Sequence, residues 1–260
     1  KGPELSDRML KQAKQFGLEV ETFEVKNIKM GTDKMVSAPI FIVSDGERNI
    51  SALSLIIAAG ARWNKLGIPG EDRLAGRGVS YCATCDGPLF RNKRVAVIGG
   101  GDTAIEDALF LAKFAAKITV VHRRERLRAA KILQERAFTA KGIEFCFNST
   151  PLEIVGKDKV EGIKIKDLSS NEESVLKTGG VFVLIGITAN SDIVKGLVKL
   201  DERGCVITDD EMRTSVDGIF ACGDVRRKVL RQVVTAAGEG AAAAVSAKEY
   251  VDRLKGIEYK

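Results

Sequence analysis

Residues 95–104 have the sequence Val95-Ala96-Val97-Ile98-Gly99-Gly100-Gly101-Asp102-Thr103-Ala104. The four apolar residues predict a buried strand, and the glycines predict a tight turn into a helix. Apolar residues then recur at helical spacing on one face: Ala104, Ile105, Ala108, Leu109, Ala112 and Ala115. A G-x-G-x-x-A turn alone is a weak signal, but with a strand before it and an amphipathic helix after it, it is typical of a dinucleotide-binding fold. The residues expected to contact the cofactor here are Gly99, Gly101, Asp102 and Thr103.

The next predicted strand indicates which nicotinamide cofactor is bound. It ends at His122-Arg123-Arg124, about where an NAD site has an acid for the ribose 2′-hydroxyl. These residues, with Arg128 about a turn further on, would instead bind a 2′-phosphate through charge-assisted hydrogen bonds. The competing interpretation is a solvated basic face, which we assign to Arg126 and Lys131. The sequence therefore predicts NADPH rather than NADH.

Two cysteines lie just before this motif, in Tyr81-Cys82-Ala83-Thr84-Cys85-Asp86-Gly87. Such a pair forms either a small redox-active disulfide or half of a zinc site. Zinc needs four ligands, and the remaining cysteines (Cys146, Cys205 and Cys222) are scattered singly in a chain with one histidine. We expect no metal. A redox pair beside a nicotinamide site suggests electron transfer from a cofactor to a disulfide.

Composition limits the class of protein. The chain has 260 residues, 45% of them hydrophobic and 29% charged, which is typical of a soluble globular protein with room for two domains. No run of eighteen uncharged apolar residues and no signal peptide is visible, and the odd cysteine count does not suggest a secreted disulfide framework. The net charge of +6 is modest and aromatic residues make up only 6%, which argues against nucleic-acid binding. We expect a cytoplasmic protein without membrane contacts.

An internal repeat predicts the architecture. In one copy, short strands over 143–147, 152–155, 160–166 and 174–176 lead to an apolar run over 180–186. In the other, a helix over 5–16 and segments over 19–29 and 40–44 lead to an apolar run over 53–60. Both runs end in glycine, as a buried parallel strand would. The crossings between the two copies are expected near 68–70 and 187–190.

The repeat predicts an α/β fold with two dinucleotide-binding, Rossmann-like domains, each with a parallel sheet and a β-meander. Residues 1–63 and 191–260 would form one discontinuous domain. Residues 64–190 would form the NADPH-binding domain that carries the CxxC pair. By symmetry a strand, a glycine turn and a helix should precede Lys1, so we expect the first domain to be incomplete at its N-terminus.

With these motifs the chain resembles the low-molecular-weight thioredoxin reductases, which are homodimeric flavoenzymes, over nearly all of its length. A further motif carries the resemblance: Gly218-Ile219-Phe220-Ala221-Cys222-Gly223-Asp224. The resemblance implies that residues 1–63 and 191–260 form an FAD-binding domain, and because its N-terminal part is missing we expect the chain alone to be flavin-free and inactive. It implies too that Asp224, after Gly223, contacts the ribityl chain of FAD. It also implies that Arg231-Gln232-Val233 lies along the isoalloxazine ring. The small-residue helix over 236–247 permits the close backbone approach that such a site needs.

The resemblance implies a relay from NADPH through FAD to Cys82–Cys85 and on to the disulfide of thioredoxin. In this family Cys85 is the sulfur nearest the flavin, Cys82 attacks the partner, and Asp86 handles the thiol protons. Asp86 could instead cap the turn that follows it. Two alternatives stay open. One is the flavoprotein of a peroxide-reducing (alkyl hydroperoxide reductase-like) system, against which His122-Arg123-Arg124 and the Ala-Thr spacer argue. The other is a non-catalytic NADPH-binding fragment.

Overall fold

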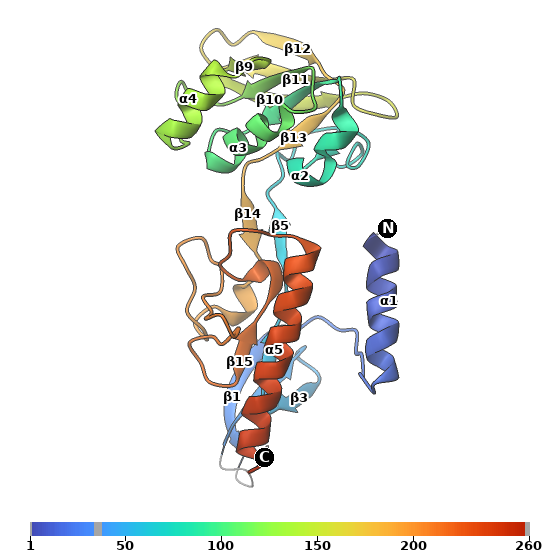
Figure 1. Cartoon of the computed structure of the whole chain (residues 1–260), viewed down its shortest axis with the longest axis vertical. Coiled ribbons are helices and arrows are strands. Elements are labelled where there is room, and N and C mark those ends of the chain that lie inside the picture. The colour runs from blue at the N-terminus through green and yellow to red at the C-terminus, as the bar shows by residue number, and fades with distance from the viewer. Residues whose placement is uncertain (1, 34–37, 258–260) are drawn as a thin grey trace. The chain divides into compact units, whose positions relative to one another are not determined.

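A computed structural model of the protein describes residues 2–33 and 38–257. The chain divides into two compact units, one of Lys1–Gly60 with Ala189–Lys260 (unit 1) and one of Ala61–Thr188 (unit 2). The two chain crossings between the units lie at β5 (Ala61–Trp63) and β14 (Ile187–Ala189), which pair with each other. Figure 1 shows the helices and strands of each unit.

Unit 2 is built on a five-stranded sheet with the order β6-β13-β7-β8-β9. Every pairing in it is parallel. The strands are β6 (Val79–Ser80), β13 (Val181–Val183), β7 (Arg94–Ile98), β8 (Lys117–Val121) and β9 (Ile143–Cys146). Since parallel strands need crossover connections, α3 (Asp102–Leu111) links β7 to β8, and α4 (Lys131–Thr139) links β8 to β9. The glycine turn after β7 therefore lies at the carboxyl edge of the sheet.

The two faces of this sheet are covered differently. Alternate residues of each strand point to opposite faces, so Val95 and Val97 pack with α3 and α4 while Ala96 and Ile98 pack with an antiparallel meander. The meander consists of β10 (Ser149–Val155), β11 (Gly162–Asp167) and β12 (Glu173–Lys177). Figure 1 shows the helices and the meander on opposite sides of the sheet. Burial on both faces explains the continuous apolar runs in the sequence.

The short helix α2 (Ala83–Asp86) and the 3-10 turn η1 (Gly87–Phe90) pack on α3. Ala83 is fully buried in the same cluster as Ala104 and Ala108. Gly87 approaches so closely that a Cβ there would lie 3.2 Å from the Leu111 side chain. Asp107 of α3 accepts a hydrogen bond from the backbone of Ala83, and burial raises the pKa of its carboxyl to about 6. Helix α3 thus holds α2 through both apolar and polar contacts.

The segment Ile68-Pro69-Gly70, predicted near a crossing between the copies, instead belongs to unit 2. Ile154 of the meander donates its backbone N–H to Pro69 O at 2.9 Å. Gly70 has a positive φ of 86°, and a Cβ there would overlap the Ile154 carbonyl. The sequence-based placement was wrong because a Pro-Gly turn within a domain has the same local signal as a linker.

Unit 1 contains a second meander and a parallel pair. The meander is β1 (Asn27–Asp33), β2 (Ala38–Ser44) and β3 (Asn49–Ala52), all antiparallel. The pair is β4 (Leu55–Ile57) with β15 (Ile219–Ala221), which come from distant parts of the chain. Phe41, Ile57 and Ile219 form part of its buried core. Helix α5 (Val233–Leu254) packs on the other side of β15, where Phe220 contacts Tyr250 in an edge-to-face pair.

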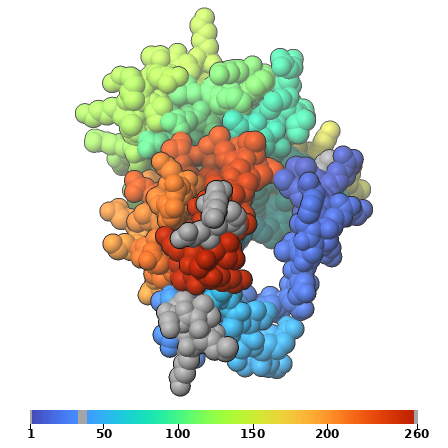
Figure 2. All heavy atoms as spheres, turned by 60° about the horizontal axis from the view of Figure 1, so that its bottom comes forward, coloured from blue at the N-terminus to red at the C-terminus, as the bar shows by residue number. Residues whose placement is uncertain are grey.

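The predicted segment over 19–29 is regular only at its end, because β1 begins at Asn27. Its alternating pattern is typical of a strand, but β2 stops at Ser44 where the chain turns back toward β3. Strand β2 is therefore too short to pair with most of residues 19–26. Helix α1 (Gly2–Gln15), seen in dark blue in Figure 2, contains no buried residue.

The predicted α/β class, with a parallel sheet and antiparallel meanders, is confirmed. Among the described helices, none has both the length and the apolar content that a membrane span requires.

Gly70→Ala should lower the free energy of unfolding of the chain by about 2–5 kcal/mol, because it adds backbone strain at positive φ to a clash with Ile154. Gly67→Ala is the matched control. Gly67 also has a positive φ, but nothing lies within 4 Å of its added Cβ, so about 1–2 kcal/mol is expected. Urea denaturation followed by circular dichroism measures both, and equal losses would contradict the packing argument.

Asp107→Asn should stabilise the protein above pH 6 relative to wild type, and the advantage should shrink as the pH falls toward 4. The pKa of Asp107 is raised in the fold from 3.8 to about 6, so its ionised form carries a cost that appears as pH rises through this window. Asparagine removes the charge and can still accept the Ala83 hydrogen bond. Denaturant midpoints between pH 4.5 and 8 measure this, with Glu135→Gln, an exposed acid on α4, as control. A pH-independent difference would contradict the assignment.

Candidate active site

Cys82 and Cys85 form a disulfide at the start of α2, with an S–S distance of 2.08 Å and a Cα–Cα distance of 5.3 Å. Cys85 is exposed and Cys82 is half-buried. Cys82 is the N-cap of α2, and its Sγ accepts a hydrogen bond from Cys85 N at 3.2 Å. The predicted redox pair is therefore closed, and of its two residues Cys85 is the more exposed.

A buried serine connects Asp86 to the redox pair. Ser80 Oγ donates to Asp86 Oδ2 at 2.7 Å and accepts from Cys82 N at 3.2 Å. Ser80 is only 3% exposed. The carboxylate of Asp86 is thus held within its own short helix, one residue after Cys85. The structure also gives Asp86 a local structural role through Ser80.

The segment before the cysteines is anchored by Glu71, which is 2% exposed. Its carboxylate accepts hydrogen bonds from Leu66 N, Gly67 N and the Tyr81 hydroxyl at 2.8–3.0 Å. Burial, together with this carboxylate, raises the pKa of Tyr81. Tyr81 therefore stays protonated and donates to Glu71, which fixes the backbone that leads into Cys82.

The glycine turn after β7 is bound to the loop that follows β8. Gly100 O accepts from Arg128 N at 2.7 Å and from Ala129 N at 3.2 Å. Asp102 Oδ1 accepts from Ala130 N at 2.7 Å. The turn and the arginine-rich loop therefore form one rigid platform, although they lie far apart in the sequence.

His122 lies beneath this turn. A Cβ on Gly100 would overlap its imidazole ring, so glycine is required there. The ring is 6% exposed, and Nε2 has no hydrogen-bond partner among the described residues. Burial lowers the pKa of His122, and the nearby arginines lower it further. The sequence grouped His122 with the arginines, whereas in the structure it is a buried side chain packed under the turn.

The three arginines and the glycine turn fit a phosphorylated dinucleotide. Arg123, Arg124 and Arg128 are exposed beside the turn. Gly101 is the N-cap of α3, with nothing within 4 Å of an added Cβ, so backbone can approach a pyrophosphate there. Thr103 and Asp102 are exposed in the first helical turn. The structure thus brings together the predicted residues of this motif, apart from the deeper placement of His122.

A third site lies in unit 1 at the end of β15, where Gly223 and Asp224 begin the 3-10 turn η3 (Gly223–Val225). Gly223 has a φ of 74°, in the left-handed region that favours glycine. Asp224 Oδ1 is buried and has no hydrogen-bond partner among the described residues. A buried acceptor of this kind suits a ligand hydroxyl, so the residues present fit the ribityl chain of FAD.

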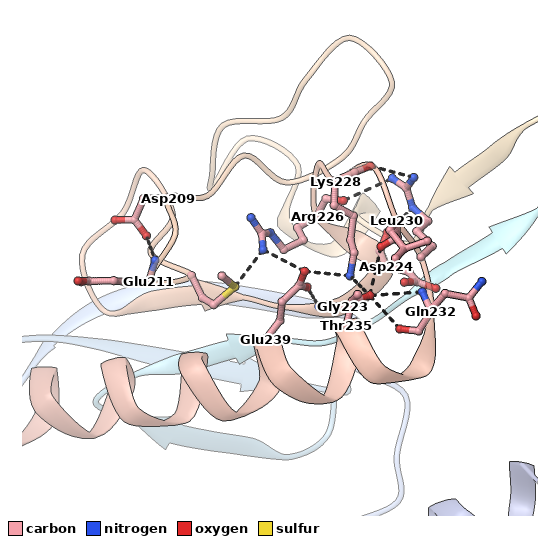
Figure 3. A network of polar contacts seen from close by, with 12 residues as sticks. Asp209, Glu211, Gly223, Asp224, Arg226, Lys228, Leu230, Gln232, Thr235 and Glu239 are labelled. Atoms are coloured by element: carbon pink, nitrogen blue, oxygen red, sulfur yellow. Dashed lines mark hydrogen bonds and ion pairs between the residues drawn. The ribbon is translucent and has the colours of Figure 1, made fainter. Parts of the chain in front are cut away.

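Two residues of the predicted flavin segment organise the chain after this turn (Figure 3). The Arg231 guanidinium donates to the carbonyls of Asp224, Arg226 and Lys228 at 3.3–3.4 Å. Gln232 is the N-cap of α5 in a reciprocal capping box with Thr235. Val233 is 64% exposed. The first two residues therefore shape the segment, and Val233 presents an apolar surface on it.

Sequence reasoning missed three residues that support these sites: Ser80, Asp107 and Glu239. Nothing in the sequence distinguishes Ser80. Asp107 interrupts the apolar face of its helix, which could have indicated a buried acid. Glu239 is an acid within a Gly/Ala-rich helix that follows two nearby cations, Arg226 and Lys228.

The remaining cysteines are free thiols. Burial raises the pKa of Cys205 and of Cys222, so neither is an activated thiolate. Cys146 donates to Ser149 Oγ at 3.1 Å. Within residues 2–33 and 38–257, no three His, Cys, Asp or Glu side chains gather as metal ligands would.

A family model described as pyridine nucleotide-disulphide oxidoreductase matches residues 3–240. The chain is 46% identical to the thioredoxin reductase of Listeria monocytogenes, over 98% of this chain and 78% of that protein. It is also 46% identical to that of Bacillus subtilis, over 98% and 79%. Among solved structures, thioredoxin reductase from Streptococcus pyogenes superimposes with a TM-score of 0.90 and 42% identity, over 97% of this chain and 81% of that one.

The disulfide, the dinucleotide turn and the buried Asp224 agree with these likenesses. The chain uses NADPH and FAD to reduce disulfides, and it belongs to the pyridine nucleotide-disulphide oxidoreductases, among the thioredoxin reductases.

Proposed function

We propose that the physiological substrate is the disulfide of thioredoxin and that Cys82–Cys85 delivers the electrons to it. The observation that carries this is the position of the redox pair on a short helix packed against α3, which begins at the dinucleotide turn. The identity of the relatives, which are thioredoxin reductases, supports the choice of partner.

We propose that residues 64–190 form the NADPH-binding domain and that residues 1–63 with 191–260 form the FAD-binding domain. The compact units, which divide after Gly60 and after Thr188, support this assignment. Gly99 and Gly101 would cradle the pyrophosphate at the start of α3. Thr103 can donate its hydroxyl to a phosphate oxygen, while Asp102 holds the arginine loop in place.

The 2′-phosphate is assigned to Arg123, Arg124 and Arg128, whose exposed guanidinium groups can form bidentate hydrogen bonds to a phosphate. His122 contributes from below, because its neutral ring supports Gly100 and so fixes the shape of the turn. The arginines and His122 have different roles because the imidazole is buried and uncharged, so it does not supply a charge to the phosphate.

In unit 1, Asp224 would accept a hydrogen bond from the ribityl chain, and the segment Arg231-Gln232-Val233 would lie along the ring system. Bound FAD would supply the conversion of a hydride from NADPH into the electron pair that opens the Cys82–Cys85 bond. Opening the bond with two electrons and two protons gives two thiols. Asp86, held by Ser80, is positioned to hold and return one of these protons.

The dithiol then passes its electrons on by thiol–disulfide exchange. The Cys82 thiolate attacks one sulfur of the partner disulfide and releases the other partner sulfur, which takes a proton. Cys85 then attacks Cys82 in the mixed disulfide, so Cys82–Cys85 re-forms and the partner leaves as a dithiol. The Cys85 N–H, 3.2 Å from Cys82 Sγ, favours the thiolate at Cys82 and supports its role as the attacking sulfur.

We propose that the enzyme works as a homodimer in the cytoplasm, as the resemblance implies. The free thiols of Cys146, Cys205 and Cys222 suit a reducing compartment.

Arg123→Ala combined with Arg124→Ala should raise KM for NADPH at least about tenfold and leave KM for NADH within about twofold, because charge-assisted bonds to the 2′-phosphate contribute roughly 1.5–3 kcal/mol each. Steady-state kinetics with both cofactors measure this. Arg126→Ala, an exposed arginine of the same loop, is the matched control and should change neither constant. Equal increases in KM for NADPH and for NADH would show that these arginines do not bind the 2′-phosphate.

Cys82→Ser should abolish NADPH-dependent reduction of thioredoxin but retain NADPH-driven reduction of an artificial acceptor that takes electrons directly from the flavin. The disulfide lies after the flavin in the relay, so its loss should not block the earlier step. Absorbance assays on the FAD-loaded enzyme follow both activities. Cys146→Ser, which changes a thiol outside the redox pair, should retain both. Loss of both activities in Cys82→Ser would contradict the proposed order.

A further inference from the structure

One carboxylate on α5 connects the flavin motif to the helix behind it. Glu239 Oε2 accepts the Gly223 backbone N–H at 2.8 Å. Its other oxygen, Oε1, lies 3.1 Å from Arg226 Nη1 and 2.9 Å from Lys228 Nζ. Figure 3 shows Glu239 pointing from α5 toward these three partners. A single side chain therefore gathers the residues that follow β15.

This cluster is largely withdrawn from water. The side chains of Glu239, Arg226 and Lys228 are 15%, 13% and 7% exposed. Exposed ion pairs contribute little to stability, but removing one partner of a buried cluster leaves uncompensated charge and is costly. Among the described residues, Glu239 is the only anion that forms ion pairs with both Arg226 and Lys228. Its loss would therefore leave two positive charges side by side.

The hydrogen bond to Gly223 fixes the residue next to Asp224. Gly223 has a left-handed backbone conformation, and Asp224 follows it directly in η3. From the other side, Arg231 Nε donates to Asp224 O at 3.4 Å. Lys228 Nζ also donates to Thr235 Oγ1 at 2.9 Å, which ties the loop to the first turn of α5. The backbone of Asp224 is thus restrained on both sides, while its buried Oδ1 has no partner among the described residues.

We propose that Glu239 is a positioning residue for FAD: it holds Gly223 against α5 so that Asp224 presents Oδ1 to a ribityl hydroxyl. The inference rests on the proposed flavin role of Asp224 and adds the residue that orients it. Nothing in this role requires Glu239 to touch the flavin. The field of the carboxylate also reaches the end of β15, where it contributes after burial to the raised pKa of Cys222.

Four variants of the FAD-loaded enzyme test the proposal. Glu239→Ala removes every contact of the carboxylate, and Glu239→Gln leaves one acceptor oxygen for three donors. Lys228→Met removes one ion pair but keeps the Gly223 hydrogen bond. Glu249→Gln changes an exposed acid on the same helix and is the matched control. For each, the FAD dissociation constant is measured by flavin fluorescence, the melting temperature by calorimetry, and NADPH affinity by titration as a check on unit 2.

We expect Glu239→Ala and Glu239→Gln to raise the FAD dissociation constant by about tenfold or more, because losing a buried hydrogen bond to a charged group is costly. Lys228→Met should lower the melting temperature while FAD affinity stays within about threefold, since the positioning bond remains. Glu249→Gln should change neither quantity. A Lys228→Met enzyme that loses FAD as strongly as Glu239→Gln would show that FAD loss follows stability alone, and would overturn the positioning role.

A double-mutant cycle with Asp224→Ala separates this inference from the proposed function. If Glu239 acts through Asp224, the two losses of FAD affinity should be clearly less than additive. Fully additive losses would overturn the inference. Unchanged FAD affinity in Asp224→Ala would refute the flavin role of Asp224 itself. If Asp224→Ala loses FAD affinity but the Glu239 variants do not, only the inference about Glu239 is refuted. A Glu239→Gln chain that does not fold would also refute only that inference.

Discussion

The close contact between α2 and α3 is the constraint on which unit 2 depends. Gly87 allows the short helix to lie against Leu111, and Ala83 is buried beside the small residues of α3. Because α3 begins at the glycine turn, the disulfide and the dinucleotide turn belong to one rigid body. A change in this packing would move the redox pair relative to the cofactor turn, even with every reactive group intact.

Carboxylates that accept backbone N–H groups recur at each supporting position. Glu71 holds the chain before the cysteines, Asp102 holds the arginine loop, Asp107 holds α2, and Glu239 holds Gly223. A charged acceptor binds an N–H more strongly than a neutral one and has a defined direction. These acids fix backbone rather than reacting groups, which explains how loops rich in glycine keep one geometry.

Much of the fold could be predicted from the sequence, because the strand, glycine turn and helix over 95–111 are encoded locally. The segment over 19–29 is a strand only from Asn27 onward, because β2 ends at Ser44 and does not extend to pair with the residues before Lys26. The cysteine pair and the arginines could be predicted from their spacing in the sequence. The position of His122 under Gly100 could not, because it depends on contact between two loops that are distant in sequence. The roles of Ser80 and Glu239 depend on tertiary contacts that no local pattern contains.

The buried imidazole of His122 has a consequence for how the enzyme distinguishes its cofactors. Histidine is the side chain whose charge ordinarily changes near neutral pH, and here burial lowers its pKa. The lowered pKa favours the uncharged form of the ring. Under the proposed assignment of the 2′-phosphate to Arg123, Arg124 and Arg128, the choice between a ribose hydroxyl and a ribose phosphate would then not depend on the charge of His122.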